Sequence, residues 1–258
     1  MFHFEEGEVF LIDKPLDWTS FDAVNLIRAV IKRYHGIRKL KVGHAGTLDP
    51  LATGLLIVCT GRMTKQIDNF QAQEKVYTGT MLLGQTTPSY DLESEPDAFY
   101  PTDGITEDMM EEARKAFLGD IMQRPPKFSA IKIQGKRAFE YARSDKEIAL
   151  KERLVHIEDF KIDTTEFPVL KFEVKCSKGT YIRSLVNDFG KALGNGACMT
   201  SLRRTKIGDF SVENAYDLME LKKMIIDEAE TDDGDGSGNE SGSGGGNENG
   251  NGNGNGNG

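Results

Sequence analysis

Cysteine is scarce in this sequence, and the few that occur form no framework. Only Cys59, Cys176 and Cys198 are present among 258 residues, and they are far apart with no CxxC or Cys/His spacing. Disulfides or a zinc site built on these thiols are therefore not expected. Cys59 lies within an apolar run and is predicted to be a small buried side chain. No other grouping of ligands stands out, so the sequence predicts neither a metal nor a cofactor.

Long hydrophobic runs are also missing. No stretch approaches the roughly 20 apolar residues needed to cross a bilayer. The N-terminal MFHFEEGEVF has no basic segment followed by an apolar one, so it is not a secretion signal. We therefore expect no membrane association and a cytoplasmic location. The phosphate-binding pattern GxxxxGK and internal repeats are absent as well.

Charge is distributed unevenly along the chain. Asp and Glu number 41 against 32 Lys and Arg, but residues 227–258 hold eight of the acids, no basic residue and 12 of the 28 glycines. Residues 1–226 then carry 33 acids against 32 bases, which is close to neutral. A segment so poor in apolar side chains has nothing to bury. We predict one folded domain over 1–226 and a disordered acidic tail over 227–258 that is dispensable for chemistry.

Basic residues of the folded part fall into three clusters: before the first glycine-rich loop, in the middle of the chain, and late. Any one cluster alone is best interpreted as a solvated helix face or loop. Three together leave a polyanionic partner open. The members are, in order, Arg28, Lys32, Arg33, Arg38, Lys39 and Lys41; Arg124, Lys127, Lys132, Lys136, Arg137 and Arg143; Arg203, Arg204 and Lys206.

Strands and helices interleave without a strict βαβ alternation, which favours a mixed α/β (α+β) fold with helices packed on a mixed sheet. The segment from Lys127 to Arg153 is basic, carries aromatic residues and is too long for a simple connection, so we predict a functional excursion there. Strands are expected over 8–13, 55–60 and 75–87, helices over 19–36 and 105–119, and a strand, a turn at Gly179 and a helix ending at Gly194 over 169–194.

The best candidate for chemistry is a single carboxylate in the loop GHAGTLDPLATG, residues 43–54. Asp49 stands between glycines and directly before Pro50, and a core strand follows. A reactive carboxylate needs a cation beside it, and Arg183 in KGTYIR could supply one. Tyr181 is predicted to alternate to the same side of a strand as Arg183. From the spacing alone, an ordinary turn aspartate remains the favoured reading.

Two further residues allow two interpretations each. His44 is a single histidine in a glycine-rich loop, and such a residue more often forms a hydrogen bond with the backbone than takes part in catalysis. Tyr77, an aromatic residue among aliphatic ones, could belong to the core or could present its ring to a nucleic-acid base. A glycoside hydrolase would need two cooperating carboxylates, and only one good candidate is visible.

These segments together resemble the TruB family of tRNA pseudouridine synthases, from about Val9 to about Asp209. The motifs that carry the resemblance are IDKP (12–15) with TS (19–20), GHAGTLDPLATG (43–54), GRMTK (61–65), KVYTGTMLLG (75–84), RPPKFSAIKIQGKRAFEYAR (124–143), CSKGTYIRSLVNDFG (176–190) and LRRTKIGDF (202–210). Asp17-Trp18 departs from the usual first motif. The chain is also expected to lack a full C-terminal PUA-type domain.

The resemblance implies a pseudouridine synthase fold, with a largely antiparallel mixed sheet flanked by helices and a thumb-like insertion at about 124–153. It implies a monomer that isomerises uridine 55 in the T-loop of tRNA without metal or cofactor. The alternative is a non-catalytic RNA-binding or tRNA-folding protein of the same fold.

The resemblance also assigns roles to residues. Asp49 would be the catalytic group, by attack on the sugar C1′, by attack on the base C6, or by proton abstraction to give a glycal. The expected supporting roles are stacking on the everted base and uptake of its C5 proton for Tyr77, pairing with Asp49 for Arg183, lining of the pocket for Tyr181, packing against uracil for Leu202, contact with the target nucleotide for His44, and support of the site for Lys65 and Asp91.

Overall fold

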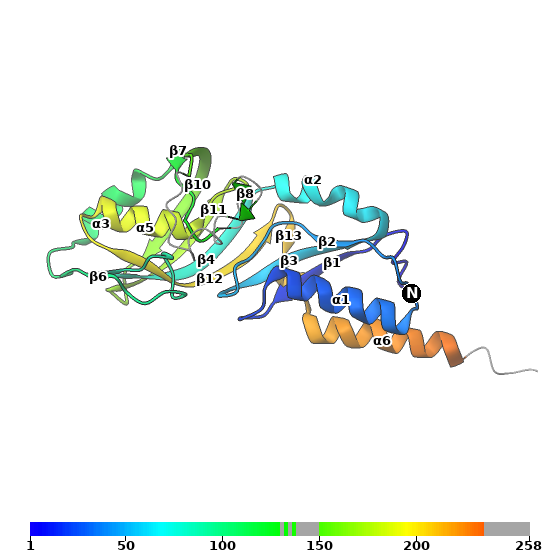
Figure 1. Ribbon diagram of the computed structural model, residues 1–258. Helices are drawn as coiled ribbons and strands as arrows, with labels where there is room; N and C mark the ends of the chain where they lie inside the picture. Colours follow the sequence, from blue (N-terminus) through cyan, green and yellow to red (C-terminus); the bar gives the residue numbers. More distant parts are fainter. Residues whose placement is uncertain (130–131, 134–135, 138–149, 235–258) are drawn as a thin grey trace, which may run out of the picture.

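The computed structural model describes residues 1–129, 132–133, 136–137 and 150–234, and one large sheet forms its centre (Figure 1). The strand order is β14, β1, β3, β12, β4, β11, β10, β7, with β2 beside β3 and β13 beside β12. The bounds are β1 Val9–Lys14, β2 Val42–His44, β3 Ala52–Thr60, β4 Lys75–Leu83, β7 Gly119–Gln123, β10 Arg153–Asp163, β11 Val169–Cys176, β12 Ala197–Ile207, β13 Phe210–Ser211 and β14 Tyr216–Asp217. Two short pairs lie outside this sheet, β5 Gln85–Thr86 with β6 Ala98–Phe99 and β8 Lys132–Ile133 with β9 Lys136–Arg137.

The sheet is mixed but largely antiparallel, which confirms the predicted fold class. Among the described strands of this sheet, the pairs β1 with β14 and β3 with β12 are parallel. The other pairings within the sheet are antiparallel.

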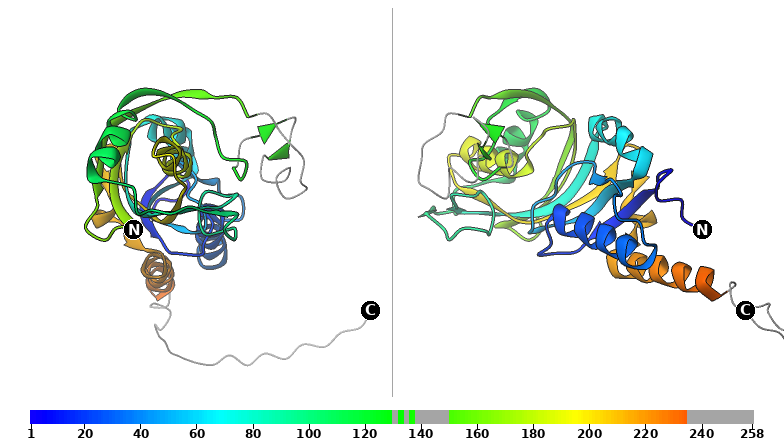
Figure 2. Two further views of the ribbon diagram at one scale, coloured as in Figure 1. Left: turned by 90° about the vertical axis from the view of Figure 1, so that its left-hand side faces the viewer. Right: turned by 45° about the vertical axis from the view of Figure 1, so that its right-hand side comes forward.

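One end of the sheet is covered on both faces because β3 is apolar from Leu55 to Cys59. Leu56 and Val58 face the helices α1 (Ser20–Tyr34) and α6 (Leu218–Gly234). Leu55 and Ile57 point the other way, toward the 3-10 helix η1 (Gly61–Gln66) and the short helix α2 (Ile67–Ala72). Figure 2 confirms that α1 and α6 lie side by side. A second 3-10 helix, η2 (Val212–Asn214), precedes β14.

The predicted helix start at Thr19 is confirmed. The Thr19 hydroxyl accepts a hydrogen bond from the Asp22 backbone N–H at 3.0 Å, and the Asp22 carboxylate accepts one from the Thr19 N–H at 2.9 Å. This reciprocal cap satisfies two backbone donors that the first turn of α1 would otherwise leave unpaired. The turn after Gly36 then leads to β2 and the glycine-rich loop.

The other end of the sheet carries α3 (Glu107–Lys115) and α5 (Ile182–Ala192) over β4, β10 and β11. The predicted strand, turn and helix within 169–194 are confirmed. The helix predicted over 105–119 is shorter than expected. It ends at Lys115 because the N–H groups of Phe117 and Leu118 bond carbonyls three residues back and close a turn. Gly119, with φ of +82°, then starts β7.

The predicted domain boundary at residue 226 falls inside α6, which continues to Gly234. Leu218, Leu221 and Ile225 pack on the α1 side of the sheet, and Ala229 is also buried. Glu228 binds the backbone N–H of Phe2 and lies 3.4 Å from the N-terminal ammonium. Residues 227–234 therefore belong to the folded part.

Two sequence predictions lie largely outside the described residues. They are the tail beyond residue 234 and most of the insertion at 124–153, including Arg143 and the side chains of Lys132, Lys136 and Arg137. Within the described part of the chain, no helix is both long and apolar enough to cross a membrane.

Candidate functional site

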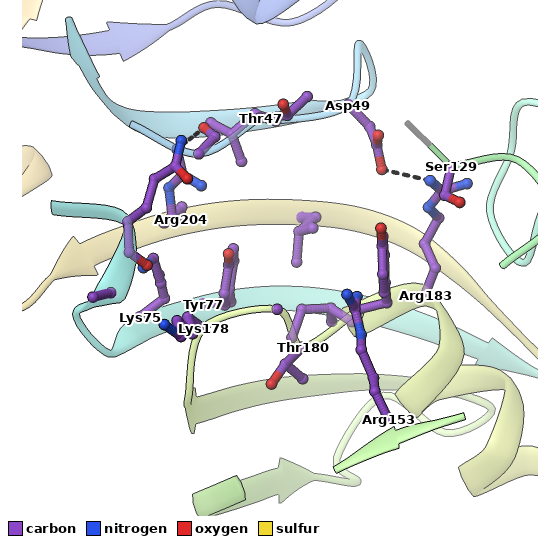
Figure 3. Close-up of a pocket in the computed structure, with 18 of the residues that line it drawn as sticks. Thr47, Asp49, Lys75, Tyr77, Ser129, Arg153, Lys178, Thr180, Arg183 and Arg204 are labelled. Carbon is purple, nitrogen blue, oxygen red and sulfur yellow. Dashed lines mark hydrogen bonds and ion pairs between the residues drawn. The ribbon is translucent and has the colours of Figure 1, made fainter. Parts of the chain in front are cut away.

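A cleft of about 680 Å³ opens over β4 and β12, between α2 and the N-terminus of α5 (Figure 3). Five of the eight predicted site residues line it: Asp49, Tyr77, Tyr181, Arg183 and Leu202. The others that line it are Gly46, Thr47, Leu48, Asp68, Gln71, Ala72, Lys75, Ser129, Arg153, Lys178, Gly179, Thr180, Ile182 and Arg204. Elements far apart in the sequence thus meet at one place.

The loop between β2 and β3 that carries Asp49 is fixed by contacts on either side. Before it, Leu48 exchanges hydrogen bonds with the buried Ser20 hydroxyl, donating its N–H at 2.8 Å and accepting through its carbonyl at 3.2 Å. After it, the Pro50 carbonyl accepts from the Asp17 N–H at 3.0 Å. The start of α1 and the chain before it therefore position the loop, which explains why the TS and LDP motifs occur together.

Lys14 adds a buried cation behind this loop. Its side chain is 0% exposed, and its ammonium donates to the carbonyls of Pro15 at 2.8 Å, Trp18 at 2.6 Å and Pro50 at 3.4 Å. Desolvation lowers the pKa of Lys14 to about 8, against the opposing effect of the Asp49 charge. Lys14 belongs to the IDKP motif that contributes to the resemblance. Nothing in the sequence indicated that its side chain would be buried.

Arg183 holds Asp49 from the α5 side. One guanidinium nitrogen lies 2.8 Å from the Asp49 carboxylate and also donates to the Phe128 carbonyl at 2.8 Å. The other donates to the Ser89 carbonyl at 3.2 Å and lies 3.5 Å from Asp91. Arg183 is 3% exposed whereas the Asp49 side chain is 39% exposed, so the carboxylate is open to the cleft while its partner is locked behind it.

Burial decides the electrostatics of this pair. Desolvation raises the pKa of the Asp49 carboxyl above its ordinary value, the Arg183 charge opposes that rise, and the nearby Asp91 charge adds to it. A carboxylate that is kept near a cation but poorly solvated is more basic than one in water, because fewer interactions stabilise its charge. Asp49 is therefore suited to act as a nucleophile or a base.

Tyr77 and Leu202 form the floor of the cleft on adjacent strands. Leu202 of β12 pairs with Gly79 of β4, and Arg204 of β12 pairs with Tyr77. The side chains of Tyr77, Leu202 and Arg204 are each 9% exposed or less. Tyr77 and Leu202 lie on the face that carries α5. Burial raises the pKa of the Tyr77 hydroxyl, so it stays a neutral phenol at ordinary pH. A flat ring beside an aliphatic side chain can hold a nucleobase by stacking.

Arg204 is a site residue that the sequence analysis placed elsewhere. It was grouped with Arg203 and Lys206 as a basic cluster, but it is 1% exposed and donates to the carbonyls of Leu55 at 2.8 Å and Gly46 at 3.1 Å. Its positive charge also opposes the rise in the pKa of the Tyr77 hydroxyl. Arg203 is ion-paired with Asp13 at 2.6 Å, which leaves Lys206 as the exposed cation of the three without a described ion pair. Alternation from Leu202 would have indicated that Arg204 faces the cleft.

Tyr181 and Arg183 do not alternate along a strand, so that prediction was wrong. Tyr181 is the residue before α5 and Arg183 lies in the first turn of the helix. Gln123 of β7 fixes Tyr181 through both backbone groups, accepting from its N–H at 2.8 Å and donating to its carbonyl at 3.0 Å. The guanidinium carbon of Arg153 lies 4.5 Å from the centroid of the Tyr181 ring, which is a cation–π contact.

Three predicted residues are not among those that line the cleft. Asp91 is buried, and its carboxylate lies 3.5 Å from the Arg183 guanidinium. His44 lies in β2, where desolvation and the Arg204 charge lower the pKa of its imidazole, and its Nδ1 is buried with no described partner. Lys65 is exposed on η1. Within the described chain, no three or more His, Cys, Asp or Glu residues come together as a metal site would require.

Known proteins resemble this chain over most of its length. The N-terminal domain of TruB family pseudouridylate synthases matches residues 32–182, and the C-terminal domain of tRNA pseudouridylate synthase B matches residues 183–235. The tRNA pseudouridine synthase B of Parabacteroides distasonis is 54% identical over 210 residues, covering 81% of this chain and 89% of that protein. The protein of the same name from Flavobacterium johnsoniae is 54% identical over 214 residues, covering 83% and 93%.

Solved structures share the fold. A chain of a Cbf5-Nop10-Gar1 complex superposes with a TM-score of 0.63 at 28% identity, and the match covers 88% of this chain and 60% of that one. A chain of an H/ACA ribonucleoprotein bound to a substrate RNA containing 2′-deoxyuridine superposes with a TM-score of 0.60 at 28% identity, covering 85% and 53%.

The sheet, the cleft and these relatives define a pseudouridine synthase, an isomerase that changes the bond between uracil and ribose. Within that class, the chain belongs to the TruB family of pseudouridylate synthases.

Proposed function

We propose that this enzyme converts uridine 55 in the T-loop of tRNA to pseudouridine, with Asp49 as the catalytic carboxylate. The observation that carries the proposal is the 2.8 Å ion pair between Asp49 and the buried Arg183, at the wall of a cleft whose floor is Tyr77 and Leu202. The relatives named above support tRNA as the substrate, because both are tRNA pseudouridine synthases.

The reaction needs no co-reactant to balance. The bond between N1 and C1′ breaks, the uracil turns, C5 bonds to C1′, and the C5 proton is lost while N1 gains one. Asp49 can attack C1′, attack C6 or abstract a sugar proton, and each of these roles requires its ionised form. A raised pKa makes the ionised carboxylate a better base or nucleophile, provided that the pH stays above that pKa.

Tyr77, Leu202 and Tyr181 are proposed to hold the everted uracil. A uridine inside a folded loop must leave its stack before its glycosidic bond can be reached, which costs a few kcal/mol. Stacking on the Tyr77 ring and phosphate contacts from basic side chains would offset that cost. Because the raised pKa keeps Tyr77 neutral, the hydroxyl can accept the C5 proton only if it gives up its own at the same time.

The proposed roles of the outlying residues follow from their positions. Asp91 would position Arg183, and His44, neutral at the edge of the loop, would contact the RNA beside the target. We propose a monomer that binds the T-arm, because the described residues of one chain bring Asp49, Arg183 and Tyr77 to one cleft.

Replacing the Asp49 carboxylate with an amide tests its catalytic role. We expect Asp49→Asn to retain RNA binding and to reduce pseudouridine formation by about 10⁴-fold or more. The fold should survive, because a folded-state pKa above the unfolded one means that ionised Asp49 lowers stability as pH rises through that window, and Asn carries no charge. The measurements are binding of a T-arm RNA and pseudouridine mapping after incubation.

Asp68→Asn is the matched control. Asp68 is an exposed carboxylate of α2 that lines the same cleft and has no described ion pair. Its variant should form pseudouridine at nearly the normal rate. Normal turnover by Asp49→Asn would refute the assignment, and absence of product from the wild-type chain would favour the non-catalytic RNA-binding alternative.

A further inference from the structure

The cleft contains more positive charge than its own residues neutralise. Five cationic side chains line it, and three of them are occupied by protein groups: Arg183 with Asp49, Arg204 with two carbonyls, and Lys75 with the carbonyls of Gln71 and Gln73. Arg153 and Lys178 are the remaining two. Among the described residues, no carboxylate lies within ion-pair distance of either side chain.

Arg153 is held in place although its charge is unpaired. Its guanidinium lies over the Tyr181 ring, with 4.5 Å between the guanidinium carbon and the ring centroid. A Cβ at Gly179 would lie 3.7 Å from the same carbon, so the turn at Gly179 lies in contact range of the guanidinium. A guanidinium fixed in this way presents a constant edge to the cleft and loses little conformational entropy on binding a ligand.

The Nε of Arg153 is a buried donor without a partner in the described structure. Buried polar groups in native proteins are nearly always hydrogen-bonded, so an unpaired one beside a ligand cleft indicates a ligand group that completes it. Lys178 is the second of these two cations and also lines the cleft. Figure 3 shows Arg153 and Lys178 on the side opposite the Asp49 loop.

We propose that Arg153 and Lys178 form a phosphate subsite that binds one backbone phosphodiester next to the target uridine. The inference rests on the proposed function, since it takes the ligand to be an RNA strand whose target sugar lies at Asp49. An arginine edge donates two N–H groups to two oxygens of a phosphate at once, and Lys178 adds a mobile point charge at the exposed rim. The subsite sets the position of the strand, so that the sugar of the everted nucleotide reaches Asp49.

The alternative is that Arg153 only supports the Tyr181 ring and that Lys178 is solvated. The two accounts differ in what the variants change. Loss of a phosphate contact weakens binding and lowers its dependence on salt, and it leaves the chemical step nearly unchanged. Loss of ring support displaces Tyr181 and lowers kcat without changing the salt dependence.

The decisive experiment removes the charge from either side of the contact. Two T-arm RNAs each carry one uncharged methylphosphonate linkage, placed 5′ or 3′ of the target uridine, and each is titrated with the full chain and with Arg153→Met. We expect one of the two linkages to weaken wild-type binding about tenfold, and Arg153→Met to weaken binding of the unmodified RNA by about the same factor. That linkage should cost Arg153→Met almost nothing further.

Lys178→Met provides a second variant that does not depend on packing, because Lys178 is exposed. It should weaken binding about threefold, the range of an exposed ion pair, with the same linkage preference. Lys161→Met is the matched control, since Lys161 is 64% exposed and already paired with Glu173 and Asp159. Its RNA affinity should not change.

Strictly additive losses at both linkages would overturn the subsite. Pseudouridine formation by the wild-type chain is measured with the same RNAs. Additive losses in a chain that converts the RNA refute the subsite alone. Coupled losses in a chain that makes no pseudouridine support the subsite and refute the proposed reaction.

Discussion

Asp49 and Asp91 compete for one guanidinium. Arg183 lies 2.8 Å from Asp49 and 3.5 Å from Asp91, and it is 3% exposed, so little water reaches the group that both carboxylates share. One cation between two acids leaves a net negative charge in a poorly solvated place. Desolvation is the main reason why the pKa of Asp49 is raised in spite of its ion pair, and the Asp91 charge adds to that rise.

The shared guanidinium makes a prediction about pH. Because the reaction needs ionised Asp49, kcat/KM should fall as the pH drops through its raised pKa, above the ordinary carboxyl range near pH 4. Asp91→Asn removes a charge that raises this pKa, so its acid limb should move to lower pH. Arg183→Met removes the cation that opposes the rise, so its limb should move to higher pH. The measurement is kcat/KM of each variant against pH.

Opposite shifts of the two variants separate electrostatics from damage. A general loss of structure would lower activity at every pH and would not move the limb in opposite directions. Circular dichroism checks folding, which matters most for Arg183→Met because it also removes bonds to two carbonyls. Limbs that coincide in all three proteins would show that Asp49 does not govern the profile.

The sequence could predict residues at this scale when their motifs were distinctive, and not otherwise. Asp49, Tyr77 and Arg183 were found through the resemblance, and the structure brings them to one cleft. Arg204 and Lys14 were not assigned to the site, since a buried cation looks the same in a sequence as an exposed one. Only the fold shows that carbonyls surround both.

At the scale of elements, the start of β3, which directly follows the Asp49 loop, packs closely against β12. Gly54 of β3 pairs with Arg204, and a Cβ at Gly54 would lie 2.3 Å from the Arg204 carbonyl oxygen and 2.8 Å from its nitrogen. Its φ is +100°. The glycine therefore permits a close approach between the two strands.

Gly54→Ala should separate these strands. The methyl group meets backbone atoms that cannot move aside, and the positive φ adds strain, so we expect a loss of on the order of 2–5 kcal/mol in unfolding free energy and a large loss of turnover. Gly36→Ala is the matched control, because its φ is also positive, +69°, but nothing lies within 4 Å of the added carbon. It should cost about 1–2 kcal/mol and leave turnover unchanged.

Denaturant unfolding and pseudouridine assays on both variants measure these effects. Equal losses for Gly54→Ala and Gly36→Ala would mean that dihedral strain alone matters and that the approach of β3 to β12 does not position the loop.

Elements with regular patterns were predictable, and irregular ones were not. The cap and the apolar spacing predicted α1, and a continuous apolar run predicted β3. β12 and β10 were not predicted because bulges interrupt their alternation, between Met199 and Ser201, Arg204 and Lys206, and Ile157 and Asp159. A bulge shifts the alternation of side chains between the two faces, so the sequence pattern no longer predicts a strand there.

At the scale of the whole molecule, α1, α2 and α6 lie at one end of the sheet and α3 and α5 at the other (Figure 1), and residues from both ends line the cleft. The half with α1, α2 and α6 supplies the Asp49 loop, and the half with α3 and α5 supplies Arg183 and Tyr181. The parallel pairing of β3 with β12 joins strands that are distant in the sequence. Local patterns carry no information about such pairings, so the strand order could not be derived from them.

The length of α6 leads to a prediction about the stability of truncated chains. A chain that ends at Ile226 loses buried Ala229 and the Glu228 contacts with the N-terminus, whereas one that ends at Gly234 keeps every described contact. We expect the shorter chain to lose about 1–2 kcal/mol and 2–8 °C in Tm, and the longer one to match the full chain. Turnover at low temperature should be equal in all three, because no described residue beyond Arg204 lines the cleft. Thermal melts and pseudouridine assays measure both, and a Tm for the chain ending at Ile226 equal to that of the full chain would restore the domain boundary at 226.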